Sequence, residues 1–216
     1  MKEKTKISKL QLILTVLSVS CLLISNIVTA KQMLLPFNIT MTCAVFVFPI
    51  TYILSDIFSE IYGYKWSRLT CYLGFAMNLL MVAVFELSIV TPAPSYWGNQ
   101  EAFATVLGNT PRILFASLLA FLVGDLVNDK VFRRMKRKYS DTHKGFSIRA
   151  IVSSFCGEMI DSCIFIPLAF LGQMPFGTLA KMLIIQVSLK TAYEIMILPL
   201  TNILVKHISI YEKRSE

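Results

Sequence analysis

The residues best suited to chemistry in this chain are acidic side chains inside apolar stretches. Of the 13 Asp and Glu residues, eight fall within or at the ends of stretches long enough to span a membrane. An ionised acid near the centre of a membrane helix costs about 2.5–3.5 kcal/mol on insertion scales. Several such costs in one small protein require an offsetting gain from partners inside a helix bundle or from a ligand. The eight acids are Asp56, Glu60, Glu86, Asp125, Asp129, Glu158, Asp161 and Glu194.

Several of these acids form pairs with helical spacing. Residues three or four positions apart lie on one side of an α-helix, so each pair presents two carboxyl groups to the same face. Neutral polar residues extend these faces, and the last apolar stretch carries an amide, an ammonium and a carboxylate along one stripe. The predicted substrate-binding residues are therefore Asn26, Tyr52, Asp56, Glu60, Asp125, Glu158, Asp161, Gln186, Lys190 and Glu194.

Many of these residues also have a purely structural interpretation. Glu60 lies where it would reach solvent at the membrane interface, and Asn26 would suit an ordinary hydrogen bond between helices. Lys190 and Glu194 are one turn apart and would suit an ion pair within their own helix. The structural interpretation is weakest for the deepest acids, which have no cation in their own helices: Asp56, Glu158 and Asp161.

Clustered carboxylates suit cations, protons or a ligand with adjacent N–H donors. The chain also contains 15 Phe, 8 Tyr and 2 Trp, whose faces offer stacking surfaces for a flat heterocycle as well as ordinary lipid-facing packing. A guanine-like edge carries a ring N–H beside an amino group, and one carboxylate can accept both hydrogen bonds. The residues thus favour a polar site within the membrane, without identifying its ligand.

The elements that position these residues are predicted to be membrane helices. The chain has 216 residues, of which 55% are hydrophobic and only 16% charged, whereas soluble domains carry roughly 25% charged residues. A spanning helix needs about 20 mostly apolar residues. The sequence therefore predicts an all-α polytopic membrane protein with six transmembrane helices over Leu10–Ala30, Ile39–Tyr62, Leu69–Val90, Ile113–Phe132, Ile148–Leu171 and Leu179–Lys206.

The basic residues predict the orientation of these spans. Of 21 Lys and Arg residues, 17 lie in the N-terminal tail, after the second and fourth spans, and at the C-terminus. Basic segments remain in the cytoplasm, so we expect cytoplasmic tails at residues 1–9 and 207–216 around a transmembrane domain at 10–206. We expect a multi-pass protein of the bacterial plasma (inner) membrane. The same clustering attributes the net charge of +8 to lipid contacts and argues against a nucleic-acid partner. A short interfacial helix is expected within Gln100–Leu107.

No catalytic or metal-binding pattern is visible in the sequence. It contains no GxSxG, HExxH or phosphate-binding loop, and His143 and His207 are both predicted at the cytoplasmic side. The five cysteines fall in apolar stretches without a CxxC pattern, which favours packing over metal binding. We expect no enzymatic activity and no cofactor, while coupling to protons or cations and assembly as a homodimer stay open.

The stretch Phe48–Lys65, which reads FPITYILSDIFSEIYGYK, resembles the signature of the queuosine precursor transporters. These are bacterial membrane proteins that were earlier named as vitamin uptake transporters. Shorter similarities follow in the same order at Ser25–Lys31, Asn109–Ile113 and Glu158–Gly172, so that the resemblance covers about residues 20–200.

The resemblance implies a six-helix carrier for 7-deazaguanine precursors of the queuosine modification, such as preQ0, preQ1 or queuine. We expect the three deepest acids at the ligand, with Asn26, Tyr52, Gln186, Lys190 and Glu194 as orienting groups. Two other functions stay open at this point. One is the substrate-binding S component of an energy-coupling-factor importer, and the other is a cation or metal carrier.

Overall fold

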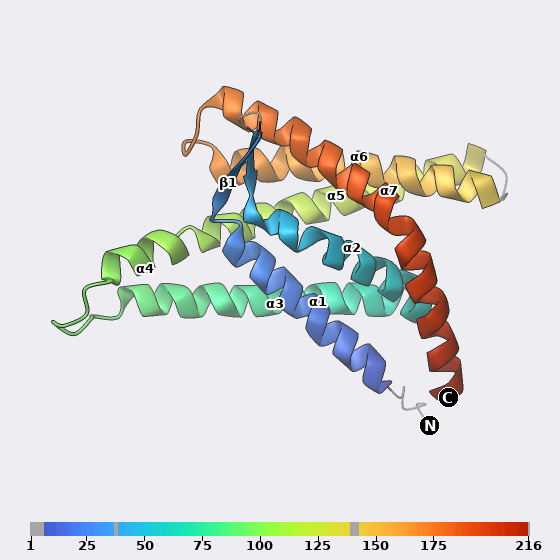
Figure 1. Cartoon of the computed structure of the whole chain (residues 1–216), viewed down its shortest axis with the longest axis horizontal. Helices are drawn as coiled ribbons and strands as arrows, with labels where there is room; N and C mark the ends of the chain where they lie inside the picture. The colour runs from blue at the N-terminus through green and yellow to red at the C-terminus, as the bar shows by residue number, and fades with distance from the viewer. Residues whose placement is uncertain (1–6, 37–38, 139–142, 216) are drawn as a thin grey trace.

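A computed structural model describes residues 7–36, 39–138 and 143–215 and shows a predominantly helical protein with one small hairpin (Figure 1). The elements are α1 (Lys9–Val28), β1 (Gln32–Leu35), β2 (Ile39–Thr42), the 3-10 helix η2 (Cys43–Phe46), α2 (Phe48–Ile57), the π-helix η3 (Phe58–Tyr62), α3 (Gly63–Val90), α4 (Gln100–Leu107), α5 (Thr110–Lys138), α6 (His143–Phe170) and α7 (Phe176–Ser215). The short helix expected at Gln100–Leu107 is present as α4.

Five helical segments in the described part of the chain are long and apolar enough to cross a membrane. Many large hydrophobic side chains along them are exposed, as expected for surfaces that face lipid. The chain is therefore an all-α, multi-pass membrane protein. The five segments are Lys9–Val28, Lys65–Val90, Gln100–Asn128, Val152–Phe170 and Phe176–Thr201.

The prediction of a spanning helix over Ile39–Tyr62 is wrong. Its first residues form β2, which pairs antiparallel with β1, and the helix begins only at Phe48. Pro49 suits this start, because proline has no N–H to donate and is favoured in the first turn of a helix, where that N–H would have no partner. The 10 residues of α2 and the 5 of η3 span about 22 Å, less than the roughly 30 Å of a bilayer core. Gly63, with φ of +77°, then separates η3 from α3.

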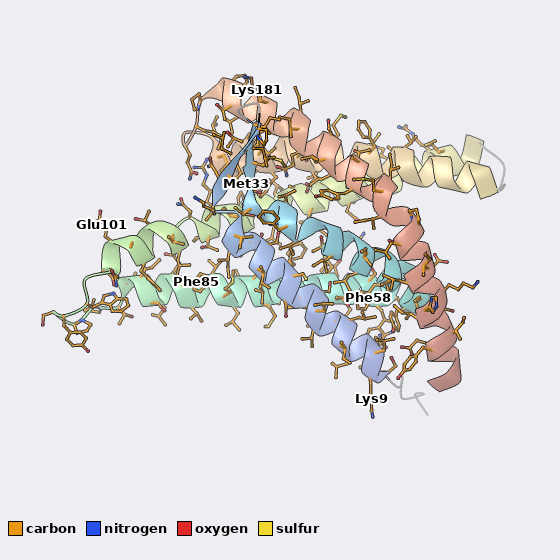
Figure 2. All side chains as sticks on the ribbon, viewed as in Figure 1. Lys9, Met33, Phe58, Phe85, Glu101 and Lys181 are labelled. Atoms are coloured by element: carbon orange, nitrogen blue, oxygen red, sulfur yellow. The ribbon has the colours of Figure 1, made fainter. Side chains whose placement is uncertain are left out.

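The two ends of the described chain lie together, as Figure 1 shows. The hydroxyl of Ser8, which caps α1, donates to Glu212 Oε1 at 2.6 Å, and the Tyr62 hydroxyl donates to the same oxygen at 2.8 Å. Burial, with a smaller contribution from Glu212, raises the pKa of Tyr62 above its ordinary range, so this hydroxyl keeps its proton and donates. Lys9 on α1 and Glu101 on α4 lie at opposite ends of the molecule (Figure 2).

Two hydrophobic clusters hold the helices together. The first joins α5, α6 and α7, and includes Ile166 and Met182 at 0% exposure. The second joins α1, α2 and η3 to the last third of α7, and Figure 2 labels Phe58 within it. Helix α7 contributes to both clusters, and Gln186 and Lys190 lie on it between them. The helix also continues to Ser215, so the predicted C-terminal tail extends α7.

Helices α5 and α6 approach each other so closely that backbone meets backbone at two glycines. A β-carbon placed on Gly124 would lie 2.9 Å from the carbonyl oxygen of Gly157, and one on Gly157 would lie 3.0 Å from the Gly124 oxygen. Small residues allow membrane helices to approach until their backbones touch. The same β-carbon on Gly124 would lie 3.1 Å from Asp161 Cβ, so Asp161 is held against α5.

Candidate polar site between α6 and α7

An ion pair joins α6 to α7 near the middle of both spans. Lys190 Nζ donates to Asp161 Oδ2 at 2.8 Å, and the two side chains are 10% and 26% exposed, respectively. The position is central because the spans run over Val152–Phe170 and Phe176–Thr201. Two of the predicted substrate-binding residues are thus in direct contact.

This pair is a stronger indication of function than of stability. The cost of removing two charges from water offsets most of their attraction, so an apolar pair of similar volume would often hold the helices equally well. Ionisable residues inside a membrane span are functional candidates for the same reason. Lys190 also contacts a different helix from the one that the sequence suggested, because its partner Asp161 lies on α6 and not on α7.

Further polar side chains surround this pair on both helices. Gln186 lies one turn before Lys190 and is 2% exposed, while Ser162 follows Asp161 and is 0% exposed. Glu158, one turn before Asp161 and Ser162, has its Oε2 atom buried. We call this group the polar layer; its members are Glu158, Asp161, Ser162, Gln186 and Lys190.

The neutral side chains of the polar layer include buried atoms without a hydrogen-bond partner in the described part of the chain, namely Ser162 Oγ and Gln186 Oε1. A buried polar atom without a partner costs about 1–3 kcal/mol. Ser162 is not among the residues that the sequence predicts at the site, because serine is uncharged and common in membrane helices. Its position next to Asp161 and one turn after Glu158 was the available signal.

Asn26 is predicted at the site but lies in another helix contact. Its Nδ2 donates to Asn78 Oδ1 at 2.7 Å, which joins α1 to α3, and Asn78 Nδ2 donates to the Gly74 carbonyl oxygen at 2.9 Å. Asn26 and Asn78 are 5% and 0% exposed. This arrangement is typical of polar residues that link membrane helices.

Asp125 and Glu60 also lie outside the polar layer. The Asp125 carboxylate forms an ion pair with Arg68, which links α5 to the first turns of α3. Glu60 is exposed on η3, in agreement with its interfacial interpretation. Asp125 therefore has a local partner in the described structure, whereas Glu60 lies at its surface.

Three predicted substrate-binding side chains fall outside the described residues. Tyr52 and Asp56 belong to α2 and Glu194 to α7, but the positions of their side chains are not among those described. The same holds for Asp129 and His143, while His207 is exposed near the end of α7.

The described residues hold no group of three or more His, Cys, Asp or Glu side chains that would bind a metal ion. All five cysteines are free thiols, and Cys21 is buried within the second hydrophobic cluster.

The start of α5 and the end of α6 are joined by an arginine. Arg112 donates through Nε to the Leu168 carbonyl oxygen at 2.7 Å and through a terminal nitrogen to the Leu171 carbonyl oxygen at 2.6 Å. The last carbonyl groups of a helix lack partners within that helix, so these bonds cap α6. Pro167, the proline predicted inside this span, lies one residue before Leu168.

Comparison with known proteins agrees with this architecture. A family described as putative vitamin uptake transporter matches residues 42–204. A protein of Bacillus subtilis (strain 168) named "Probable queuosine precursor transporter" is 26% identical over 163 residues, which cover 76% of this chain and 71% of that protein. No solved structure matches. The family match includes the whole polar layer, and this chain belongs to the family of vitamin uptake and queuosine precursor transporters.

Proposed function

We propose that this protein is a carrier of the bacterial plasma membrane that imports queuosine precursors, 7-deazaguanines such as preQ0, preQ1 or queuine, through the polar layer. The observation that carries the proposal is the Asp161–Lys190 ion pair at the middle of two spans in a member of a transporter family. The name of the Bacillus subtilis relative supports the substrate class.

The geometry of the ion pair suits a ligand with N–H donors. Asp161 is the more exposed partner, at 26% against 10% for Lys190, so its carboxylate is the group that a solute reaches first. A carboxylate can accept hydrogen bonds from N–H donors of a ligand, such as an amino group or an aminomethyl cation. Lys190 donates a hydrogen bond to this carboxylate when no ligand is bound, and an aminomethyl cation on the ligand would compete for the same oxygen atoms.

We propose that both ends of the chain face the cytoplasm. Ser8 and Glu212 are hydrogen-bonded to one another, so Lys9 at the start of α1 and the end of α7 belong to the same end of the molecule. Basic segments remain on the cytoplasmic side of bacterial membranes. A reporter enzyme that is active only outside the cytoplasm should be inactive when fused after residue 216, and activity of that fusion would contradict this orientation.

Uptake by neutralised variants tests the proposed site. Labelled preQ1 would be supplied to cells that cannot make queuosine precursors and that express the wild type, Asp161→Asn or Lys190→Met. We expect at least a tenfold loss of uptake for both variants at equal amounts of membrane-inserted protein. Glu101→Gln, on the exposed outer helix α4, is the matched control and should retain uptake. Unchanged uptake by both site variants would exclude the polar layer as the transport site.

Reconstitution separates this function from that of an importer subunit. Purified protein in liposomes should transport labelled preQ1 without any other protein. Transport that appears only after addition of a separate ATPase module would identify the chain as the substrate-binding component of a larger importer.

A further inference from the structure

Ser162 and Gln186 are the two fully buried neutral side chains of the polar layer. Their exposures are 0% and 2%, and Ser162 Oγ and Gln186 Oε1 make no hydrogen bond to any described residue. More than nine in ten buried polar groups in proteins have a hydrogen-bond partner. Two such atoms in one layer therefore indicate a partner that the described chain does not supply.

The register of α6 against α7 places these two side chains at a similar depth. The helices run antiparallel, because only Leu171–Pro175 connects them, and the Asp161–Lys190 bond fixes their register. Ser162 lies one turn from Ile166, and Gln186 lies one turn from Met182; both neighbours belong to the same hydrophobic cluster. One helical turn covers about 5.4 Å, so Ser162 and Gln186 each lie within about one turn of both that cluster and the ion pair.

We infer that Ser162 and Gln186 form a recognition pair for a lactam edge of the transported molecule, in which a ring N–H lies beside a carbonyl oxygen. The inference rests on the proposed function and names the part of the substrate that this site reads. Gln186 Oε1 accepts the hydrogen bond from the ring N–H, and the Ser162 hydroxyl donates to the carbonyl oxygen. The neighbouring Asp161 carboxylate then remains for an amino group or an aminomethyl cation.

This pair predicts which heterocycles the site accepts. A 7-deazaguanine carries the ring N–H and the carbonyl oxygen, whereas a 7-deazaadenine carries a ring acceptor and an amino donor at the same two positions. The second compound presents its ring acceptor to the acceptor Gln186 Oε1, so this hydrogen bond is lost, and the Ser162 hydroxyl must turn to accept from the amino group. A site built on hydrogen bonds rejects an analogue that leaves its polar groups unpaired.

Competition for uptake tests this pair. Cells that take up labelled preQ1 would be challenged with unlabelled 7-deazaguanine or 7-deazaadenine. For the wild type, we expect 7-deazaguanine to compete at least tenfold better. Ser162→Ala and Gln186→Met should reduce this ratio at least fivefold, and Ser162→Thr, which keeps the hydroxyl, should restore much of it.

Thr201→Val provides the matched control. Thr201 is also on α7, is 4% exposed and has a buried Oγ1 without a partner among the described residues, but it lies 15 positions beyond Gln186. Its replacement should leave the competition ratio unchanged. If Thr201→Val, Ser162→Ala and Gln186→Met all keep the wild-type ratio, the recognition pair is disproved.

Thermal stability separates recognition from a structural role. Removal of a polar atom that has no partner leaves no broken bond behind, so Ser162→Ala should unfold at the wild-type temperature or above it while its selectivity falls. A lower unfolding temperature with unchanged selectivity would show a structural hydroxyl and overturn the inference. Absence of any preQ1 uptake by the wild type would instead contradict the proposed function itself.

Discussion

Helix α6 makes two contacts of opposite character. Towards α5 its backbone meets another backbone at Gly124 and Gly157, with no room for a β-carbon on either residue. Towards α7 it presents the polar layer, with an ion pair and two buried polar atoms that have no partner in the described chain. The first contact resists any change in helix separation, whereas the second consists of groups that can exchange partners.

This difference indicates which helices move together. Backbone contact between small residues tolerates little displacement, so α5 and α6 are expected to behave as one unit. Hydrogen bonds and ion pairs in the membrane are individually modest and can re-form with a solute. A ligand that enters between α6 and α7 would exchange contacts with the polar layer without disturbing the α5–α6 pair.

The largest expected effect on stability comes from removing one charge of the ion pair, so that the other charge has lost its partner. Lys190→Met should lower the free energy of unfolding by about 3–5 kcal/mol, because it leaves the Asp161 carboxylate without its partner. The double variant Asp161→Asn with Lys190→Met should recover most of this loss, since neither charge remains. Denaturation in detergent measures the free energy of unfolding of the single and the double variant. Equal stability of the wild type and Lys190→Met would show that the pair is solvated, and the contrast between the two α6 contacts would disappear.

Overpacking the α5–α6 contact should have the next largest effect. Gly124→Ala forces a β-carbon to within 2.9 Å of a carbonyl oxygen, and we expect a loss of about 1–3 kcal/mol in stability. Gly177→Ala is the matched control, because a β-carbon there meets nothing within 4 Å. Thermal unfolding of the two variants makes the comparison. If both unfold at the same temperature, α5 and α6 can separate easily and do not form a unit.

The Asn26–Asn78 contact between α1 and α3 adds a third case to this comparison, because it is polar but its hydrogen bond is formed within the protein. Asn26→Ala removes the hydrogen bond between α1 and α3 and should cost about 0.6 kcal/mol and at most about 1.7 kcal/mol, the average and the maximum measured for such bonds in a membrane protein. Uptake per folded molecule should be retained, since Asn26 lies outside the polar layer. A selective loss of uptake at normal stability would instead make Asn26 part of the transport site, as the sequence predicts.

The long apolar stretches of the sequence predicted most of the fold correctly. Composition identifies α1, α3, α5, α6 and α7, because a membrane helix needs a long apolar run and little else. Composition fails over Ile39–Tyr62, where the average is apolar but Pro49 blocks the helix and the preceding residues pair with β1. Strand pairing depends on a partner strand outside the segment over which hydropathy is averaged, so hydropathy alone cannot detect it.

The site was predictable in its residue types but not in its pairings. Spacing suggested that Lys190 would meet Glu194, one turn along the same helix, whereas the antiparallel register of α6 and α7 brings it to Asp161. Registers between helices depend on packing over the whole interface, such as the contact of Ile166 with its cluster. Charged residues in apolar stretches predicted the acids of the site. Ser162 is neutral and has no such signal, and its importance follows from its burial.

The smallest expected effect concerns the contact at the chain ends, where Tyr62 donates to Glu212. Tyr62→Phe should cost about 0.5–1.5 kcal/mol at neutral pH, the usual value of one hydrogen bond. Because burial raises the pKa of Tyr62, the folded state holds this proton more tightly than the unfolded state, where the pKa is about 10. The stability of the wild type should therefore fall as the pH rises above about 10. Tyr62→Phe has no hydroxyl at this position and should not show this part of the fall.

Unfolding curves recorded from pH 7 to 11 test this expectation. The stability difference between the wild type and Tyr62→Phe should shrink above about pH 10, where the unfolded chain begins to release the tyrosine proton. Tyr96→Phe, at an 88% exposed position, is the control and should give a constant difference. A constant difference for Tyr62→Phe as well would mean that its hydroxyl is solvated. In that case the chain ends are held by hydrophobic packing, as α5 and α6 are, and not by exchangeable hydrogen bonds like those of the polar layer.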